Sequence, residues 1–341
     1  MTAWQSALHA DPLPWLLEGR DPAVRHLALQ RLLGEDQDAP AVRGARVAAM
    51  ASHPIATFLD AQDPEGWWIM PGSGYGPKYR GTVWTLIVLD QMGADGSDQR
   101  VGRGCEYVLE HAQAPSGGIG MRGGREARKP PPPSTVLHCL NGNILRALIG
   151  FGRLDDERVD RVIAWQAASI TGEDGIDYFV SGTAGPGFRC AANEGMPCAW
   201  GASKALLALA RIPPERRDAS VVAALDATAE FLLRHDPAVA DYPMGYGNTK
   251  PNASWFKLGF PSGHVTDVLQ VLEGLCEAGR AADTRLSHAL DWLLSKQDEQ
   301  GRWTNRYAYA GKMIADIDAQ GRPSKWVTLR ACAVLRAMLG D

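Results

Sequence analysis

Two stretches of sequence decide the fold: QDPEGWW at residues 62–68 and QDEQGRW at residues 297–303. Both follow the pattern Gln-x-x-x-Gly-x-Trp. A third copy, at residues 113–119, keeps the glutamine and the glycine and has isoleucine in place of tryptophan. Weaker equivalents lie at residues 166–176 and 235–242. Successive copies are roughly 50 to 70 residues apart, which is within reach of a repeat built from two helices.

The segments between these motifs contain apolar residues at helical spacing, and they come in pairs. The first member of a pair is apolar nearly all round, as at residues 84–93 and 200–210. The second is amphipathic, as at residues 101–111 and 221–234. A helix that is apolar on all sides has to be buried. The pattern therefore favours an inner ring of apolar helices with an outer ring packed against it.

We predict an all-α protein, an α/α toroid of about five to six helical hairpins with inner and outer helix rings. It would form one domain over residues 1–341, with divergent helices at residues 1–60 and the repeats at residues 61–341. In each motif the glycine permits a tight turn, and the glutamine amide can bond carbonyls at helix ends. An open solenoid made of the same hairpins is the alternative.

The motifs resemble the QW repeats of squalene-hopene and oxidosqualene cyclases, and the alternating helices resemble the β-subunits of protein prenyltransferases. The resemblance covers residues 50–340. It implies an enzyme that binds an apolar, often isoprenoid, molecule in a central cavity lined by the N-termini of the inner helices and adjoining loops. Two signatures of these families are missing. The D-x-D-D acid of the cyclases has only Asp316-Ile317-Asp318 as a counterpart, which we interpret as a surface turn, and the chain has no Asp-x-Cys pair.

Cysteine is the most informative residue type, because six cysteines in 341 residues are too few for a disulfide scaffold. Cys139 enters one apolar segment, and Cys190 and Cys198 flank the loop that enters the next. A closed ring would bring the three thiols to the same end. With one more ligand they would make a tetrahedral zinc site. The candidates for that ligand are Asp177, which we favour, His138 and His264. Unliganded thiols are the alternative.

Catalytic residues are expected at the same end of the ring. A thiol near a helix N-terminus is biased toward the thiolate, so Cys139 is a candidate together with its neighbour His138. His264 and Asp267 have the spacing of an i, i+3 pair on a helix and could exchange protons with a substrate.

Aromatic and basic residues recur just before the apolar helices. Aromatic faces stabilise developing carbocations, and a lysine there could hold a diphosphate or a carboxylate. Alternatively, the aromatic rings only close the end of the toroid. The substrate-binding residues that we expect at this rim are Tyr79, Trp84, Asn143, Trp200, Trp255, Lys257 and Trp326.

Composition excludes several classes of function. A net charge of −4 with no basic run gives no support for nucleic-acid binding. No apolar stretch approaches the ~20 residues needed to span a bilayer, and the N-terminal residues do not read as a signal peptide. We therefore expect a cytoplasmic protein. The Gly-rich segment at residues 117–133 lacks the strand and helix that flank a nucleotide-binding loop, so no nucleotide cofactor is expected.

Taken together, these patterns favour an enzyme that acts on an apolar small molecule, such as an isoprenoid, in a central cavity, with thiols that could hold zinc. The first alternative is a noncatalytic toroid that binds a lipophilic ligand or a protein partner, with any zinc structural. The second, by analogy with α/α-barrel enzymes, is a cysteine-dependent dehydratase or isomerase of small terpene alcohols. The oligomeric state is left open.

Overall fold

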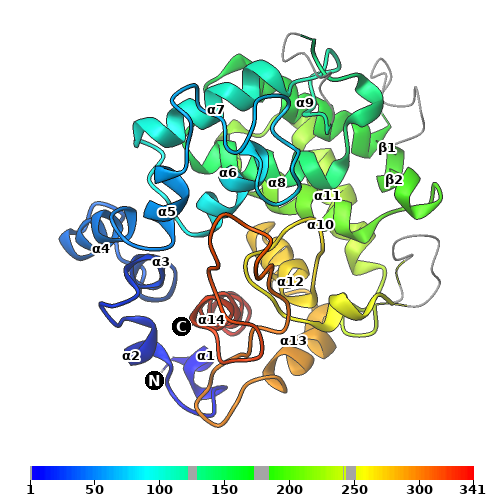
Figure 1. The fold of residues 1–341 in the computed structure, drawn as a ribbon. Helices are drawn as coiled ribbons and strands as arrows, with labels where there is room; N and C mark the ends of the chain where they lie inside the picture. The colour runs from blue at the N-terminus through cyan, green and yellow to red at the C-terminus, as the bar shows by residue number, and fades with distance from the viewer. Residues whose placement is uncertain (1, 122–128, 173–183, 241, 243–250) are drawn as a thin grey trace.

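The computed structural model describes residues 2–121, 129–172, 184–240, 242 and 251–341, and helices predominate in it (Figure 1). Six helices form an inner ring. Most residues of each inner helix are buried, and α10 buries eleven of its twelve residues. The inner helices are α3 (Pro22–Leu33), α6 (Thr82–Gln91), α8 (His138–Gly150), α10 (Ala199–Ala210), α12 (Val268–Glu277) and α14 (Lys325–Leu339).

The inner ring is closed. Each helix packs against the next in the order α6, α8, α10, α12, α14 and α3. The last gap is filled where Gly93, just beyond α6, meets α3: a Cβ atom at Gly93 would come within 2.6 Å of the His26 ring. One cavity at the centre receives side chains from all six helices. The all-α toroid predicted from the sequence is therefore confirmed, and the open solenoid is not what forms.

The outer helices are amphipathic and cover the inner ring. In α7, for example, Val101, Cys105 and Val108 are buried on one face. The N-terminal α1 packs against α14 and so supplies the outer helix of the last hairpin. The outer helices are α1 (Ala3–Ser6), α4 (Pro40–Met50), α7 (Gln99–His111), α9 (Glu157–Thr171), α11 (Ala219–Leu233) and α13 (Ser287–Leu294). The short α2 (Leu13–Leu16) and α5 (Ile55–Asp60) lie in connections.

The three Gln-containing motifs have the same geometry, in which the glutamine is bridged to the residue six positions later. The Gln62 side-chain amide donates to the carbonyl of Arg100 in α7, at 2.8 Å. The Gln113 amide donates to the carbonyl of Arg158 in α9, at 2.7 Å. The Gln297 amide donates to the carbonyl of Ala7, at 3.1 Å. Each motif thus ties its turn to the next outer helix, and the last one ties the C-terminal half to the N-terminal segment.

Two features of the structure favour glycine at this position of the motifs. Gly66 and Gly117 have φ values of 96° and 98°, which side chains rarely adopt. A Cβ atom on either would also lie 2.7 Å from a carbonyl oxygen of the neighbouring outer helix, that of Arg103 or Arg161. The motif therefore allows the turn to approach the next helix closely.

Strands play a small part in the described residues. β1 (Ala184–Gly185) and β2 (Arg189–Cys190) form an antiparallel pair in which Ala184 lies opposite Cys190. An isolated bridge between Arg189 and Pro197 closes the loop that follows. This small structure fixes Cys190 next to the start of α10.

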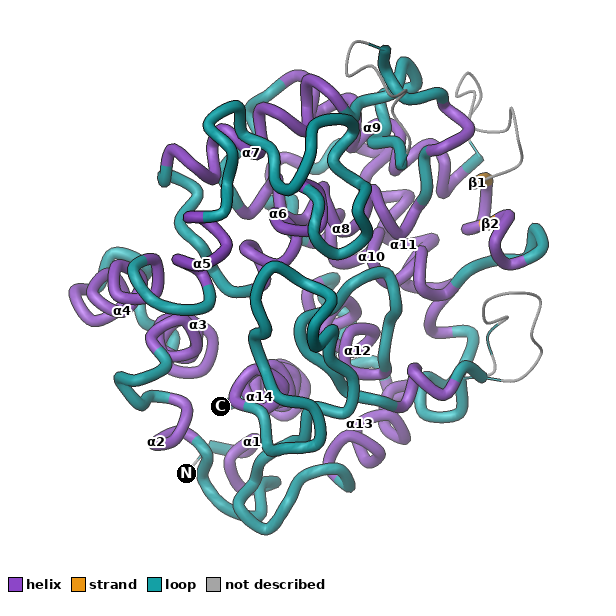
Figure 2. The backbone as a smooth tube through the Cα atoms, in the orientation of Figure 1, coloured by secondary structure: helices purple, strands orange, loops and turns teal. Residues whose placement is uncertain are grey.

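Loops cover the end of the ring at which the inner helices begin (Figure 2). The segments 251–267 and 304–324 cross there and are joined by a bridge between Gly259 and Tyr307. The Asn305 amide donates to the carbonyl of Phe260 at 3.0 Å. The ring of Tyr309 packs 4.5 Å from that of Tyr79, between centroids. No helix among the described residues has the length and apolar character required to cross a membrane.

Candidate functional site

The three thiols singled out in the sequence lie together. Cys139 is in the first turn of α8, Cys190 ends β2, and Cys198 is the residue before α10. All three line one small cavity of about 10 Å³. The closed ring brings them together because α8 and α10 are neighbours and start at the same end.

The environments of the thiols differ. The Cys198 thiol donates a hydrogen bond to Cys190, and with the backbone N–H groups of Ala192 and Asn193 it lowers the pKa of Cys190 to about 6, against the effect of burial. Cys190 is therefore largely a thiolate at pH 7. Burial raises the pKa of Cys139 to about 11, so Cys139 keeps its proton. The thiol with the lowered pKa is therefore Cys190, whereas the catalytic role that we gave to Cys139 from the sequence stays a prediction.

A zinc site is not formed by the described residues. Among them, no group of three or more His, Cys, Asp or Glu side chains has an arrangement that could hold a metal. The favoured fourth ligand, Asp177, lies outside the described residues. His138, another candidate, uses both ring nitrogens: Nε2 contacts the carbonyl of Gly185 at 3.0 Å and Nδ1 contacts the Gln166 amide at 3.1 Å. We interpret His138 as a structural residue, and zinc remains a prediction.

The aromatic residues predicted at the rim do gather there. The rings of Tyr79 and Trp84 are 5.1 Å apart, and His264 lies 5.8 Å from Trp200, between centroids. The Tyr79 hydroxyl contacts Nδ1 of His264 at 3.4 Å. Burial first, and then the nearby lysines, lower the pKa of His264 to about 4, so the imidazole is neutral at pH 7. The loop that carries Tyr309 packs on these rings, while Tyr79, Trp200 and His264 stay half-buried, and their role in substrate binding remains a prediction.

Other predicted site residues serve the structure. His264 and Asp267 do not form a helical pair, because α12 begins only at Val268. The Asp267 carboxylate caps that helix and accepts hydrogen bonds from the backbone N–H groups of Gln270 and Gly259, at 2.9 and 3.0 Å. Trp255 is fully buried and donates to the carbonyl of Pro237 at 2.8 Å. Lys257 lines a separate cavity of about 10 Å³ beside the loop 304–324.

The central cavity lies deeper in the ring than we expected from the family resemblance. It has a volume of about 50 Å³, and its lining comes mainly from the middle and the C-terminal parts of the inner helices. Of the predicted binding residues only Asn143 and Trp326 contribute to it. A basin of about 420 Å³ shares four lining residues with the cavity and extends toward the C-terminal ends of α12 and α14. The basin therefore borders the cavity on the side opposite the aromatic rim.

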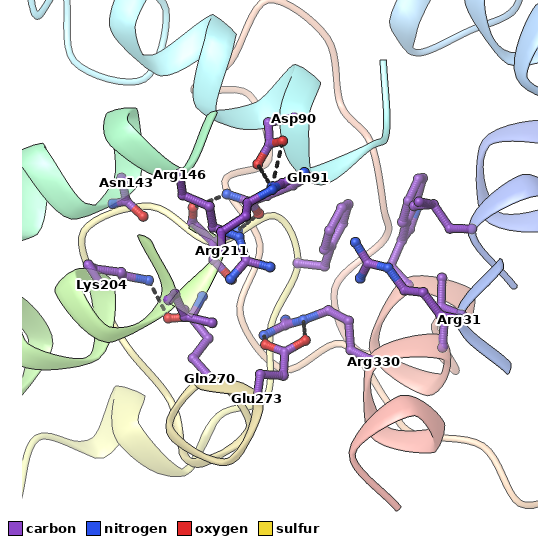
Figure 3. Close-up of a pocket in the computed structure, with 16 residues that line it drawn as sticks. Arg31, Asp90, Gln91, Asn143, Arg146, Lys204, Arg211, Gln270, Glu273 and Arg330 are labelled. Carbon is purple, nitrogen blue, oxygen red and sulfur yellow. Dashed lines mark hydrogen bonds and ion pairs between the residues drawn. The ribbon is translucent and has the colours of Figure 1, made fainter. Parts of the chain in front are cut away.

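The cavity is charged. Five cationic and three anionic side chains line the cavity and the basin together. Figure 3 shows the guanidinium groups of Arg31, Arg146, Arg211 and Arg330 around one space, with Lys204 and Gln270 at its edge. Its apolar wall includes the rings of Phe260 and Trp326, which stack 4.4 Å apart.

Three of the arginines are neutralised by carboxylates. The Arg330 guanidinium binds Glu273 through two hydrogen bonds, the longer of 2.8 Å, and donates a third to the carbonyl of Gly259. Arg211 binds Asp90 at 2.9 and 3.0 Å. Arg146 binds Glu277 at 3.0 and 3.2 Å. All three carboxylates are thus engaged by arginines, and among the described residues none of them forms an ion pair with the two remaining cations of the cavity.

Those remaining cations are Arg31 and Lys204. Within the described part of the chain, the Arg31 side chain has no hydrogen bond or ion pair, although burial and the nearby Arg146 lower its pKa. Lys204 is 1% exposed, and among the residues that the structure describes its ammonium group donates only to the neutral Gln270 amide oxygen. Burial lowers the pKa of Lys204 to about 7, against the opposing effect of Asp267. The cavity thus presents one unpaired guanidinium and one amine that is about half neutral at pH 7.

Sequence reasoning missed both residues. Lys204 stands alone among alanines and leucines in residues 199–210, and Arg330 and Glu273 likewise interrupt apolar helices. A single charge inside a helix that must be buried on all sides is the signal that could have found the site, because such a charge needs a partner or a function. Arg31 carries no comparable signal, since it lies in the divergent N-terminal region.

Solved structures that resemble this chain include the type II terpene cyclase MstE from Scytonema (12% identity, TM-score 0.32, covering 84% of this chain and 96% of the cyclase). A variant of that cyclase in complex with geranylgeranyl dihydroxybenzoate matches with 14% identity and a TM-score of 0.30, covering 84% of this chain and 94% of the variant. A glycosyl hydrolase of family 88 from Bacteroides vulgatus matches with 11% identity and a TM-score of 0.49, covering 93% of this chain and 91% of the hydrolase. No family model and no curated protein sequence matches the chain. Likenesses this distant carry no conclusion about activity, and the toroid fold rests on the packing of the chain's own helices.

Proposed function

We propose that this toroid is an enzyme that binds a small molecule with an anionic group in its central cavity. The observation that carries the proposal is the excess of positive charge there, in which Arg31 has no partner among the described residues and Lys204 has only a neutral one. Lys204 is 1% exposed, and a buried cation without a countercharge is costly. Arg31 is half-buried, and it adds an unpaired positive charge to the cavity wall. A bound carboxylate or phosphate would remove that cost, and a guanidinium binds either group with two parallel hydrogen bonds.

The rest of the ligand has an apolar surface to contact. Leu27, Leu329 and the stacked pair of Phe260 and Trp326 contribute to the cavity, and Ala333 and Val334 contribute to the basin. An isoprenoid or other lipophilic body, as predicted from the sequence, would lie along these side chains with its charged end at Arg31. The ligand that the site favours is therefore amphipathic and anionic, which is more specific than the apolar molecule of the sequence prediction.

Two groups have properties suited to catalysis in this cavity. Lys204 can take up or release a proton at neutral pH, because its pKa is close to 7. Arg31 stays charged and can hold the anionic group in one orientation. The noncatalytic alternative would use the same cations only to hold a ligand. A reactive Lys204 amine would favour the enzyme over the noncatalytic binding protein.

Calorimetric titration with inorganic phosphate, diphosphate, citrate and short-chain carboxylates tests the proposal. At least one of these anions should bind the wild type, and Arg31→Gln should weaken its binding roughly 10- to 100-fold, as for the loss of a charge-assisted hydrogen bond. Arg43→Gln is the matched control, because Arg43 is exposed on the outer helix α4. The proposal fails if no anion binds, or if the two variants bind the same anion equally well.

A second candidate function rests on the thiols. Cys139, Cys190 and Cys198 line one cavity, and Cys190 is set up as a nucleophile. Cysteine-dependent isomerase or dehydratase chemistry would use Cys190 as the base and the protonated Cys139 as the acid. Elemental analysis with thiol titration tests the zinc alternative. About one zinc per chain would assign the thiols to a metal site, whereas metal-free protein with a titratable Cys190 would leave them available for catalysis.

A further inference from the structure

The Lys204 side chain begins at a point where the backbones of α8 and α10 meet. A Cβ atom on Gly142 of α8 would lie 2.3 Å from the carbonyl carbon of Lys204, so the two backbones touch at this residue. The side chain extends from there to the edge of the cavity, where its Nζ meets the Gln270 amide oxygen of α12 (Figure 3). The amine is therefore positioned by two neighbouring helices and faces the central space.

The surroundings of Lys204 favour an uncharged amine. The carboxylate of Asp267 is engaged by two backbone N–H groups, and that of Glu273 is engaged by Arg330. Arg330 itself acts on Lys204 as a like charge, while Asp267, Glu273 and Cys139 act in the opposite direction. Burial is the largest influence and favours the neutral form. A neutral amine has a free lone pair and is a nucleophile, whereas an ammonium group is not.

We propose that Lys204 forms an imine with a small carbonyl compound whose anionic group is held by Arg31, such as a 2-oxo acid. This inference rests on the proposed function for the binding of the anionic group, and it adds the substrate class. A cavity of about 50 Å³ has room for roughly four water-sized positions, which suits the head of a 2-oxo acid. Any longer chain on the acid would extend into the basin.

The step is balanced without any other reactant. The Nζ lone pair attacks the carbonyl carbon, so that a C–N bond forms while the π bond of the C=O group breaks and its oxygen takes a proton. The proton that the oxygen takes is one of the two on Nζ, and the carbinolamine then loses its hydroxyl group together with the second Nζ proton as water while the C=N bond forms. One amine and one carbonyl compound yield one imine and one water, with no oxidation or reduction. The imine then serves as an electron sink for bond changes at the adjacent carbon.

Reductive trapping tests the inference. The full-length protein is incubated at pH 7 with glyoxylate or pyruvate and sodium cyanoborohydride, and the modified lysines are located by peptide mass spectrometry. At this pH about half of Lys204 is free amine, against roughly one part in a thousand or less for an ordinary lysine. Lys204 should therefore be labelled far ahead of the surface lysines, and its labelling should fall as the pH is lowered from 7 to 5.

Two variants and one further probe make the test specific. Lys204→Met should lose the label while its circular dichroism spectrum stays that of the wild type. Arg31→Gln should lower labelling by glyoxylate at least tenfold but leave labelling by acetaldehyde, which has no anionic group, unchanged. Labelling spread over surface lysines according to exposure would overturn the inference. If calorimetry still shows anion binding that depends on Arg31, only the imine step has failed; if that binding is also absent, the proposed function has failed with it.

Discussion

Replacing Lys204 by methionine should make the protein more stable at neutral pH. Methionine has a similar length and no charge, so it fills the space between α10 and α12 without the cost of burying an ammonium group. The pKa of Lys204 falls from an ordinary value of 10.5 to about 7 in the fold. Each unit of pKa corresponds to about 1.4 kcal/mol, so burial of this amine costs the folded state roughly 4–5 kcal/mol below pH 7. Loss of the hydrogen bond to Gln270 offsets about 1–3 kcal/mol of the gain.

The pH dependence of this effect has a definite sign. Between pH 7 and 10.5 the unfolded chain holds a proton on Lys204 that the folded chain has released, so the stability of the wild type rises with pH. The methionine variant lacks this contribution. Its advantage over the wild type should therefore be largest below pH 7 and should shrink by about 2 kcal/mol between pH 7 and pH 9.

Urea denaturation of both proteins at pH 6, 7, 8 and 9 measures this difference. Lys296→Met, which removes an exposed amine outside the cavity, controls for the loss of a lysine as such. A stability difference that stays flat from pH 6 to 9 would refute the reasoning, because it would mean that Lys204 is charged in the folded protein. Destabilisation of Lys204→Met by several kcal/mol at every pH would point to the same conclusion.

Three other predictions concern the ring and the thiols. Gly142→Ala should destabilise the protein by about 1–3 kcal/mol in thermal or urea denaturation, because its methyl group would collide with the Lys204 backbone. Gly44→Ala, in an outer helix with nothing within 4 Å, should instead stabilise by about 0.5–1 kcal/mol, and equal effects at the two sites would contradict the packing described. Glu273→Gln should lower the free energy of unfolding by about 3–5 kcal/mol in urea denaturation, because it leaves Arg330 buried and unpaired. Glu230→Gln, which removes the partner of Arg285 in an exposed ion pair, should change that free energy little. A small loss of stability in both variants would show that Arg330 finds another partner. Iodoacetamide at pH 7 should modify Cys190 before any other cysteine, and the rate of modification should decrease as the pH falls through 6. Peptide mass spectrometry locates the modified cysteines. Preferential labelling of Cys139 would contradict the order of thiol pKa values.

The fold could be predicted from the sequence because its repeats are local. Gln62, Gln113 and Gln297 each act within a short turn and on the next outer helix, so a copy of the motif carries its own geometry. The difference between all-round apolar and amphipathic helices follows from burial alone and assigns them to the inner and outer rings. The meeting of Cys139 with Cys190 and Cys198 could be inferred because it needs only the order of neighbouring helices.

The central site could not be predicted in the same way. Arg31 and Lys204 are separated by about half of the chain, and they face one cavity only because α3 closes the circle against α14 and the end of α6. Nor does a linear pattern tell which end of the ring is covered. The loop carrying Tyr309 packs on Tyr79 through contacts between segments more than 200 residues apart, and no local pattern in the sequence indicates this packing.

The most direct test of the central claim is a crystal structure of the protein soaked with selenate, a tetrahedral anion that can be located by the anomalous scattering of selenium. The account predicts one selenate in the central cavity, bound by the Arg31 guanidinium and within reach of Lys204, and its absence from crystals of Arg31→Gln. A cavity that holds only water, with Arg31 turned to a carboxylate or to the solvent, would contradict the claim that this cavity is built for an anionic ligand.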